Sequence, residues 1–236
     1  MRKRLAILGY ALLVIGLAFV VAGGVAYTRV QDGYDSLQAF SEAQDVQLSY
    51  NDDGQLVDRG TTEGAAAIMD TLKNDWKYPV VEGDLDPNDP LVNTGTEYMY
   101  QMATVSYHVL HGTQTIVLEE DVEYNGELFE AGTYEYDVSG KYWTDFDRKH
   151  PLEGPARAQA WSGTVHGLIG ELGVGTVTHS TLQMGLAMAA LFAGLGATLM
   201  LSGGFIAWAV RADKKTTIPD TVPEAMLQDQ GVGVKV

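Results

Sequence analysis

Two uncharged apolar runs, one near each end of the chain, constrain the fold more than any other feature. The first covers residues 5–28 and the second covers residues 172–210. About 20 apolar residues are enough for a helix to cross a bilayer once, so each run is long enough to do so. The sequence therefore predicts transmembrane helices at 5–27 and 181–210, with a separate domain at 28–180 between them.

Basic residues lie at the outer flank of each run. Residues 1–4 carry three basic side chains, and residues 211–215 carry three more. Basic residues close to membrane ends are retained in the cytoplasm. Both ends of the chain, 1–4 and 211–236, are therefore predicted to be cytoplasmic, with the domain at 28–180 outside. The tail from residue 216 is expected to be disordered.

The N-terminal run has a second interpretation, as a cleaved signal peptide. Gly24, Val25 and Ala26 offer small residues at the offsets that cleavage requires. The apolar stretch is about 21 residues long, whereas the apolar region of a signal peptide usually has about 7–15. The length favours an uncleaved anchor.

The segment between the runs is strongly acidic. Residues 28–180 hold 27 Asp and Glu against 8 Lys and Arg, and the whole chain has a formal net charge of −16. Such a surface repels nucleic acid, so we expect no nucleic-acid partner. The chain has no cysteine, which excludes thiol catalysis and Cys-ligated zinc and leaves the domain to be held by its core alone.

Periodicity within the acidic segment predicts an α+β extracellular domain with a small antiparallel sheet. Thr94 and Glu97 have the spacing of a capping box at a helix start. Asn125-Gly126 is a strong signal for a tight hairpin turn. The helical patterns cover 31–45, 61–76, 94–111 and 152–168, and the strand patterns cover 46–50, 113–118, 122–129 and 133–138.

Small residues recur at heptad spacing in both apolar runs. Small residues on one face let helix backbones approach closely in lipid. The pattern fits packing of the two helices within one chain, and it equally fits self-association or docking onto a membrane-protein partner. The packing positions are Gly9, Gly16 and Gly23 in the first run, and Ala189, Gly196 and Gly203 in the second.

His108 and His111 form the first candidate metal site. A spacing of three on a helix places both imidazoles on one face, where they could share a divalent cation. The pair is not part of a His-Glu-x-x-His motif, because residue 107 is tyrosine. Further ligands would have to come from His150, His166 or an acidic loop. The alternative is that both histidines are structural.

An acidic loop forms the second candidate cation site. Asp84, Asp86, Asn88 and Asp89 place side-chain oxygens in the manner of a calcium loop. The full EF-hand pattern fails, because its turn glycine would fall on Asp89 and its closing glutamate on Gly95. A proline-braced acidic turn that binds no cation is the alternative.

Four stretches of the chain resemble a family of actinobacterial two-pass membrane proteins. They are MRKRLAILGYALLVIGLAFVVAGG, YNDDGQLVDRGTTEGAAAIM, DPNDPLVNTGTEYMYQMATVSYHVLHGTQTIVL and TVHGLIGELGVGTVTHSTLQMGLA. Members often carry the label aromatic ring-opening dioxygenase, similar to the small subunit of protocatechuate-type extradiol enzymes. That label implies iron(II) held by two histidines and a carboxylate, for which His108 and His111 are the available pair.

These patterns favour a non-enzymatic envelope protein without a cofactor. It would be a scaffold or an accessory subunit whose extracellular domain binds a partner protein or a cell-wall component. The sequence has no Gly-x-Ser-x-Gly motif and no charged residue in the centre of either apolar run. Two alternatives stay open: a metal-dependent ectoenzyme or binder, which includes the ring-cleaving dioxygenase, and an oligomeric two-helix channel.

Overall fold

The computed structural model describes residues 2–215, and the side chains of residues 2–212. The chain divides into two compact units. The helix-pair unit consists of residues 2–29 together with the described residues from 185 onward, and the central unit is Val30–Met184. The tail for which we predicted disorder, from residue 216, lies outside the described residues.

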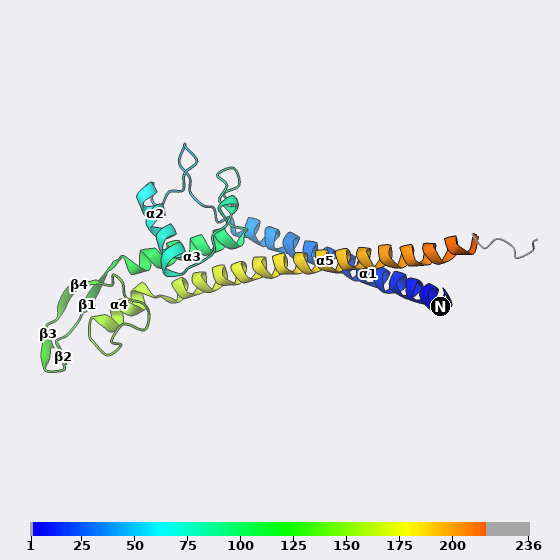
Figure 1. Ribbon diagram of the computed structural model, residues 1–236. Coiled ribbons are helices and arrows are strands. Elements are labelled where there is room, and N and C mark those ends of the chain that lie inside the picture. The colour runs from blue at the N-terminus through cyan, green and yellow to red at the C-terminus, as the bar shows by residue number, and fades with distance from the viewer. Residues whose placement is uncertain (1, 216–236) are drawn as a thin grey trace, which may run out of the picture. The chain divides into compact units, whose positions relative to one another are not determined.

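Two long apolar helices flank the rest of the chain. They are α1 (Arg2–Gln44) and α5 (Gly163–Lys215), drawn in blue and in yellow to orange in Figure 1. Each contains a stretch of at least 18 residues that is long and apolar enough to span a membrane. The patterns at 5–27 and 31–45 form one continuous helix, because the residues that join them include neither glycine nor proline.

Two helices of the central unit, α2 (Thr62–Asp70) and α3 (Gly95–Leu110), begin at the caps that the sequence predicts. The Thr61 side chain accepts a hydrogen bond from the Gly64 N–H, and Thr94 and Glu97 form the complete capping box. Each cap satisfies backbone N–H groups that have no partner within the helix. The elements are α2 (Thr62–Asp70), the π-helical turn η1 (Thr71–Asp75), the 3-10 turn η2 (Glu82–Asp84), α3 (Gly95–Leu110) and α4 (Glu153–Ala160).

Four short strands follow α3 and pair as two antiparallel ladders. The strands are β1 (Thr113–Leu118), β2 (Val122–Tyr124), β3 (Glu127–Phe129) and β4 (Gly132–Asp137). Strand β1 pairs with β4, and β2 pairs with β3. Asn125 and Gly126 have φ values of 53° and 84°, as a type I′ hairpin turn requires. The predicted antiparallel pairing is confirmed.

The predicted strand at 46–50 is wrong. The segment forms only isolated bridges, from Gln47 to Leu91 and from Tyr50 to Leu56. Because its two ends pair with different parts of the chain, no continuous ladder can grow along it.

The central unit has two apolar cores. The first joins α1, α2, α3 and α5 and contains Leu37, Ile68, Leu72, Tyr98, Ala103 and Leu172. The second lies around the end of α3, β1 and α4 and contains Val109, Ile116, Val138, Phe146, Ala156 and Trp161. Strands β1 and β4 therefore contribute one face to a core that α4 completes.

Candidate functional site

The small residues of the two apolar runs face each other in the helix-pair unit. A methyl group on Gly16 would lie 2.7 Å from the Gly196 carbonyl oxygen, and one on Gly9 would lie 3.0 Å from that of Gly203. A methyl group on Gly23 would lie 2.9 Å from the Ala189 carbonyl oxygen. The backbones therefore approach closely at all three levels, which residues larger than glycine in α1 would prevent.

The opposite faces of the same two helices are apolar and uncovered. Side chains such as Ile7 and Val14 on α1 are 68% exposed, and Leu201 on α5 is 75% exposed. A soluble monomer rarely exposes a continuous apolar surface of this kind. The helix pair therefore buries its small residues and turns its large apolar residues outward.

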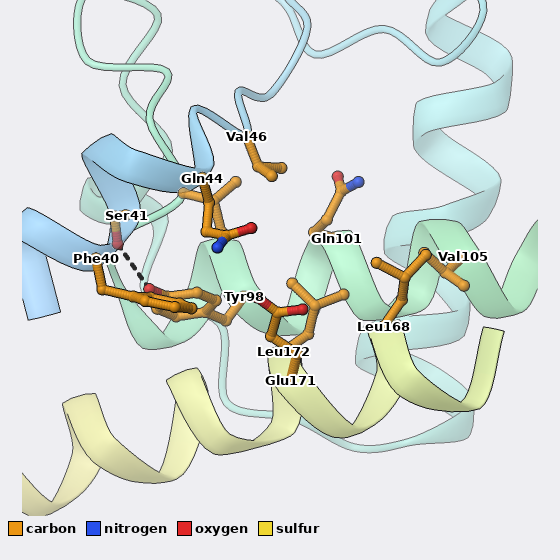
Figure 2. A pocket seen from close by; sticks show the side chains of 11 residues that line it. Phe40, Ser41, Gln44, Val46, Tyr98, Gln101, Val105, Leu168, Glu171 and Leu172 are labelled. Atoms are coloured by element: carbon orange, nitrogen blue, oxygen red, sulfur yellow. Dashed lines mark hydrogen bonds between the residues drawn. The ribbon is translucent and has the colours of Figure 1, made fainter. Parts of the chain in front are cut away.

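Three helices of the central unit meet at Tyr98. The Tyr98 hydroxyl on α3 and the Ser41 hydroxyl on α1 are 2.7 Å apart and both are buried, as Figure 2 shows by a dashed line. On the α5 side, a methyl group on Gly175 would lie 2.6 Å from the Tyr98 ring. A glycine at this position therefore lets the ring reach α1 across the surface of α5.

A small, partly open pocket of about 90 Å³ lies beside this junction, well below the volume of a typical small-ligand pocket. Its polar groups are the Ser41–Tyr98 pair and the side chains of Gln44, Gln101 and Glu171. Figure 2 shows Leu168 and Leu172 entering it from α5. The apolar lining consists of Phe40, Val46, Val92, Val105, Leu168 and Leu172.

His108 and His111 have different partners in the structure. The His108 Nε2 atom lies 2.9 Å from Oδ1 of Asp58, on the turn before α2. Helix α3 ends at Leu110, so His111 occupies the C-cap with φ −130° and stacks on Tyr107. The two imidazoles therefore have separate partners, and their use as a shared metal site stays a prediction from the sequence.

The remaining histidines lie in separate environments. The His150 Nδ1 atom accepts hydrogen bonds from the backbone N–H groups of Leu152 and Glu153. His166 contacts Trp143, and His179 contacts Tyr34, in edge-to-face geometry. Within residues 2–212, no three His, Asp or Glu side chains converge into a group that could hold a metal ion. A divalent cation stays a prediction from sequence.

The acidic loop is organised by its own hydrogen bonds. Oδ1 of Asp86 accepts from both the backbone and the side-chain N–H groups of Asn88, each at 2.9 Å. These bonds lower the pKa of Asp86. The Asp89 N–H donates to the Asp86 carbonyl oxygen, and Asp84 lies in the 3-10 turn η2. The four residues form a compact turn, and calcium binding there stays a prediction from the sequence.

A network around Glu153 fixes the segment that precedes α4. The Glu153 carboxylate accepts from the Lys141 ammonium at 2.9 Å and from the Asp147 N–H at 2.7 Å. The same Lys141 ammonium donates to the Tyr136 hydroxyl at 2.6 Å. Burial alone would raise the pKa of Glu153, but the bonds from Asp147, Lys141 and Tyr136 bring it down to about 2.

Sequence reasoning missed the Tyr98 junction and the Glu153 network. Ser41 and Tyr98 are 57 residues apart in the chain, and Lys141 and Glu153 are 12 apart. No local pattern connects such residues, and Gly175 does not stand out in the sequence, because Gly167, Gly170 and Gly173 precede it in the same helix.

No protein-family model, no curated protein and no solved structure matches this chain. The class of protein therefore follows from its own residues and geometry. The chain consists of two long apolar helices, packed on each other through small residues, that flank a small unit containing antiparallel strands.

The helix contact predicts that Gly16→Ala weakens the helix pair by about 1–3 kcal/mol, because the added methyl group overlaps the backbone of α5. Donor and acceptor fluorophores are attached to cysteines introduced at Lys3 and Ala212. Energy transfer between them falls as the helices separate when SDS gradually replaces a neutral detergent. The midpoint of separation should fall for Gly16→Ala. Gly24→Ala is the matched control, because nothing lies within 4 Å of that methyl group. An equal midpoint in both variants would contradict the contact.

The Glu153 network predicts a pH-dependent contribution to stability. The folded pKa of about 2 is below the ordinary 4.5, so the stabilisation is complete above pH 4.5 and disappears as the pH falls towards 2. At pH 6, Glu153→Gln should lower the free energy of unfolding by about 1–2 kcal/mol, because solvent screens part of the interaction at this partly exposed carboxylate, and the difference should shrink between pH 5 and about pH 2. Urea unfolding of the full chain in neutral micelles measures it.

Glu130→Gln is the control for this pH dependence. The Glu130 side chain is exposed and makes no hydrogen bond among the residues that the structure describes. Its replacement should leave the unfolding free energy unchanged at every pH. A Glu153→Gln effect that is the same at pH 6 and pH 3 would show that the carboxylate charge does not stabilise the fold.

Proposed function

We propose that this chain is a two-pass integral membrane protein, and that it acts as a non-enzymatic scaffold or accessory subunit. Its membrane spans are the N-terminal part of α1 and the C-terminal part of α5. The observation that carries the proposal is the exposure of these helices. Only 11% of each most apolar window is buried within the protein, whereas the core helix of a soluble protein would be mostly buried.

The distribution of charge supports an orientation with both ends in the cytoplasm. The basic residues of 1–4 and 211–215 flank the two spans, and basic flanks are retained on the cytoplasmic side. The acidic residues are concentrated in 28–180, which the proposal places outside. The resemblance to actinobacterial two-pass membrane proteins supports the same layout.

The partner that we propose is a protein segment carrying an apolar side chain beside a basic one. The pocket next to Tyr98 has an apolar lining, and the Glu171 carboxylate lies at the same site. Leu168, which is 43% exposed, and Phe40, which is equally exposed, remain available to a partner. An apolar anchor flanked by a cation would complement this combination and the acidic surface around it.

Site-specific photocrosslinking in native membranes tests partner binding. Benzoylphenylalanine replaces Leu168 at the pocket, and in the matched control it replaces Val117, which is 63% exposed on β1. We expect one recurrent protein adduct from position 168 and none from position 117. An adduct of twice the chain mass identifies a second copy as the partner. The absence of any protein adduct from position 168 would contradict the proposal.

A further inference from the structure

The segment 141–157 is unusually rich in basic residues for this acidic protein. It contains four of the eight Lys and Arg found in 28–180. One of them, Lys141, is neutralised by its ion pair with Glu153. The others are Arg148, Lys149 and Arg157. With Asp145, Asp147 and Glu153 also present, the segment has a net charge of +1, whereas the surrounding domain is strongly negative.

Two of these arginines lie against the same indole ring. The guanidinium carbon of Arg157 is 3.4 Å from the centre of the Trp143 ring, and that of Arg148 is 5.8 Å from it. Among the residues that the structure describes, neither guanidinium forms a salt bridge with a carboxylate. The aromatic face partly compensates each cation but supplies no counter-charge.

The Arg157 side chain also has an unsatisfied donor. Its Nη1 atom is buried and has no hydrogen-bond partner among the described residues. Burial and then the positive charge of Arg148 hold the pKa of Arg157 below its ordinary value. Two like charges without a counter-ion are unfavourable, and an anion bound to the accessible N–H groups of both guanidinium groups would relieve this repulsion.

The fold holds Arg148 in this position through its backbone. A methyl group on Gly154 would lie 2.6 Å from the Arg148 carbonyl oxygen, so only glycine permits this approach to α4. The adjoining Asp147 N–H is bound by Glu153, and His150 accepts from the first N–H groups of α4. The segment is therefore held in place by hydrogen bonds on both sides of Arg148.

We propose that Arg148 and Arg157 form a binding site for an oxyanion, a phosphate or carboxylate group of a ligand. The planar guanidinium presents paired N–H donors that match the oxygens of both groups. The bound anion accepts hydrogen bonds from the accessible N–H groups of Arg148 and Arg157 and neutralises the pair. This inference rests on the proposed function in one respect: the proposed topology places the site, and so its ligand, outside the cytoplasm.

Calorimetric titration of the full chain in neutral detergent micelles tests the site. The probe is sodium phosphate, titrated at constant ionic strength, with sodium acetate as the carboxylate probe. We expect saturable binding of at least one probe. Arg148→Ala and Arg157→Ala should each raise the Kd of that probe about tenfold or more, because each removes a charge-assisted hydrogen bond. Lys149→Ala is the matched control, because it removes a positive charge next to Arg148 but outside the proposed site. It should change the Kd less than about threefold.

Melting temperatures without ligand show whether each variant is folded. Where Arg157→Ala does not fold, Arg157→Lys replaces it, because it keeps the charge and removes the fork of donors. It should also weaken binding. No saturable binding of either probe, or an unchanged Kd in folded Arg148 and Arg157 variants, would overturn the site. The calorimetric result depends neither on a partner protein nor on how the chain is oriented in a membrane. A failure of anion binding can therefore be distinguished from a failure of the crosslinking test.

Discussion

The close approach of the α1 and α5 backbones is the contact on which the helix-pair unit depends. In lipid, apolar side chains gain little by leaving one apolar surrounding for another, so packing between surfaces that fit closely must supply the association energy. Gly9, Gly16 and Gly23 remove the side chains that would separate the helices. Their heptad spacing keeps the contact on one face along successive turns. Larger apolar residues are then left for the outward faces.

The central unit uses the same device for a different purpose. Gly175 leaves space on α5 for the Tyr98 ring, whose hydroxyl then reaches Ser41 on α1. Close by, Glu97 is almost fully buried while it caps α3. Burial raises the pKa of Glu97 although two backbone N–H groups stabilise its charged form. Small residues and local caps thus let polar groups enter a core that has no disulfide to support it.

Local signals in the sequence predicted much of the secondary structure. The Thr94–Glu97 capping box and the Asn125-Gly126 turn involve neighbouring residues, and both predictions are confirmed. The strand at 46–50 failed because pairing depends on distant partners. The contact between His108 and Asp58 could not be predicted from local sequence patterns either, since 50 residues separate the two. The arginine pair was not predicted because charged side chains are usually solvated. The sequence does show, however, that four of the eight basic residues of 28–180 lie within 141–157.

In the proposed topology both helices cross a membrane and the acidic unit lies outside. The absence of native cysteine allows a direct measurement with the single substitutions Leu128→Cys, in the β2–β3 hairpin, and Ala212→Cys, near the end of α5. A membrane-impermeant maleimide is applied to intact cells and to permeabilised cells. We predict that position 128 is labelled in intact cells and that position 212 is labelled only after permeabilisation. Labelling of both positions in intact cells, or the reverse pattern, would contradict the proposed topology.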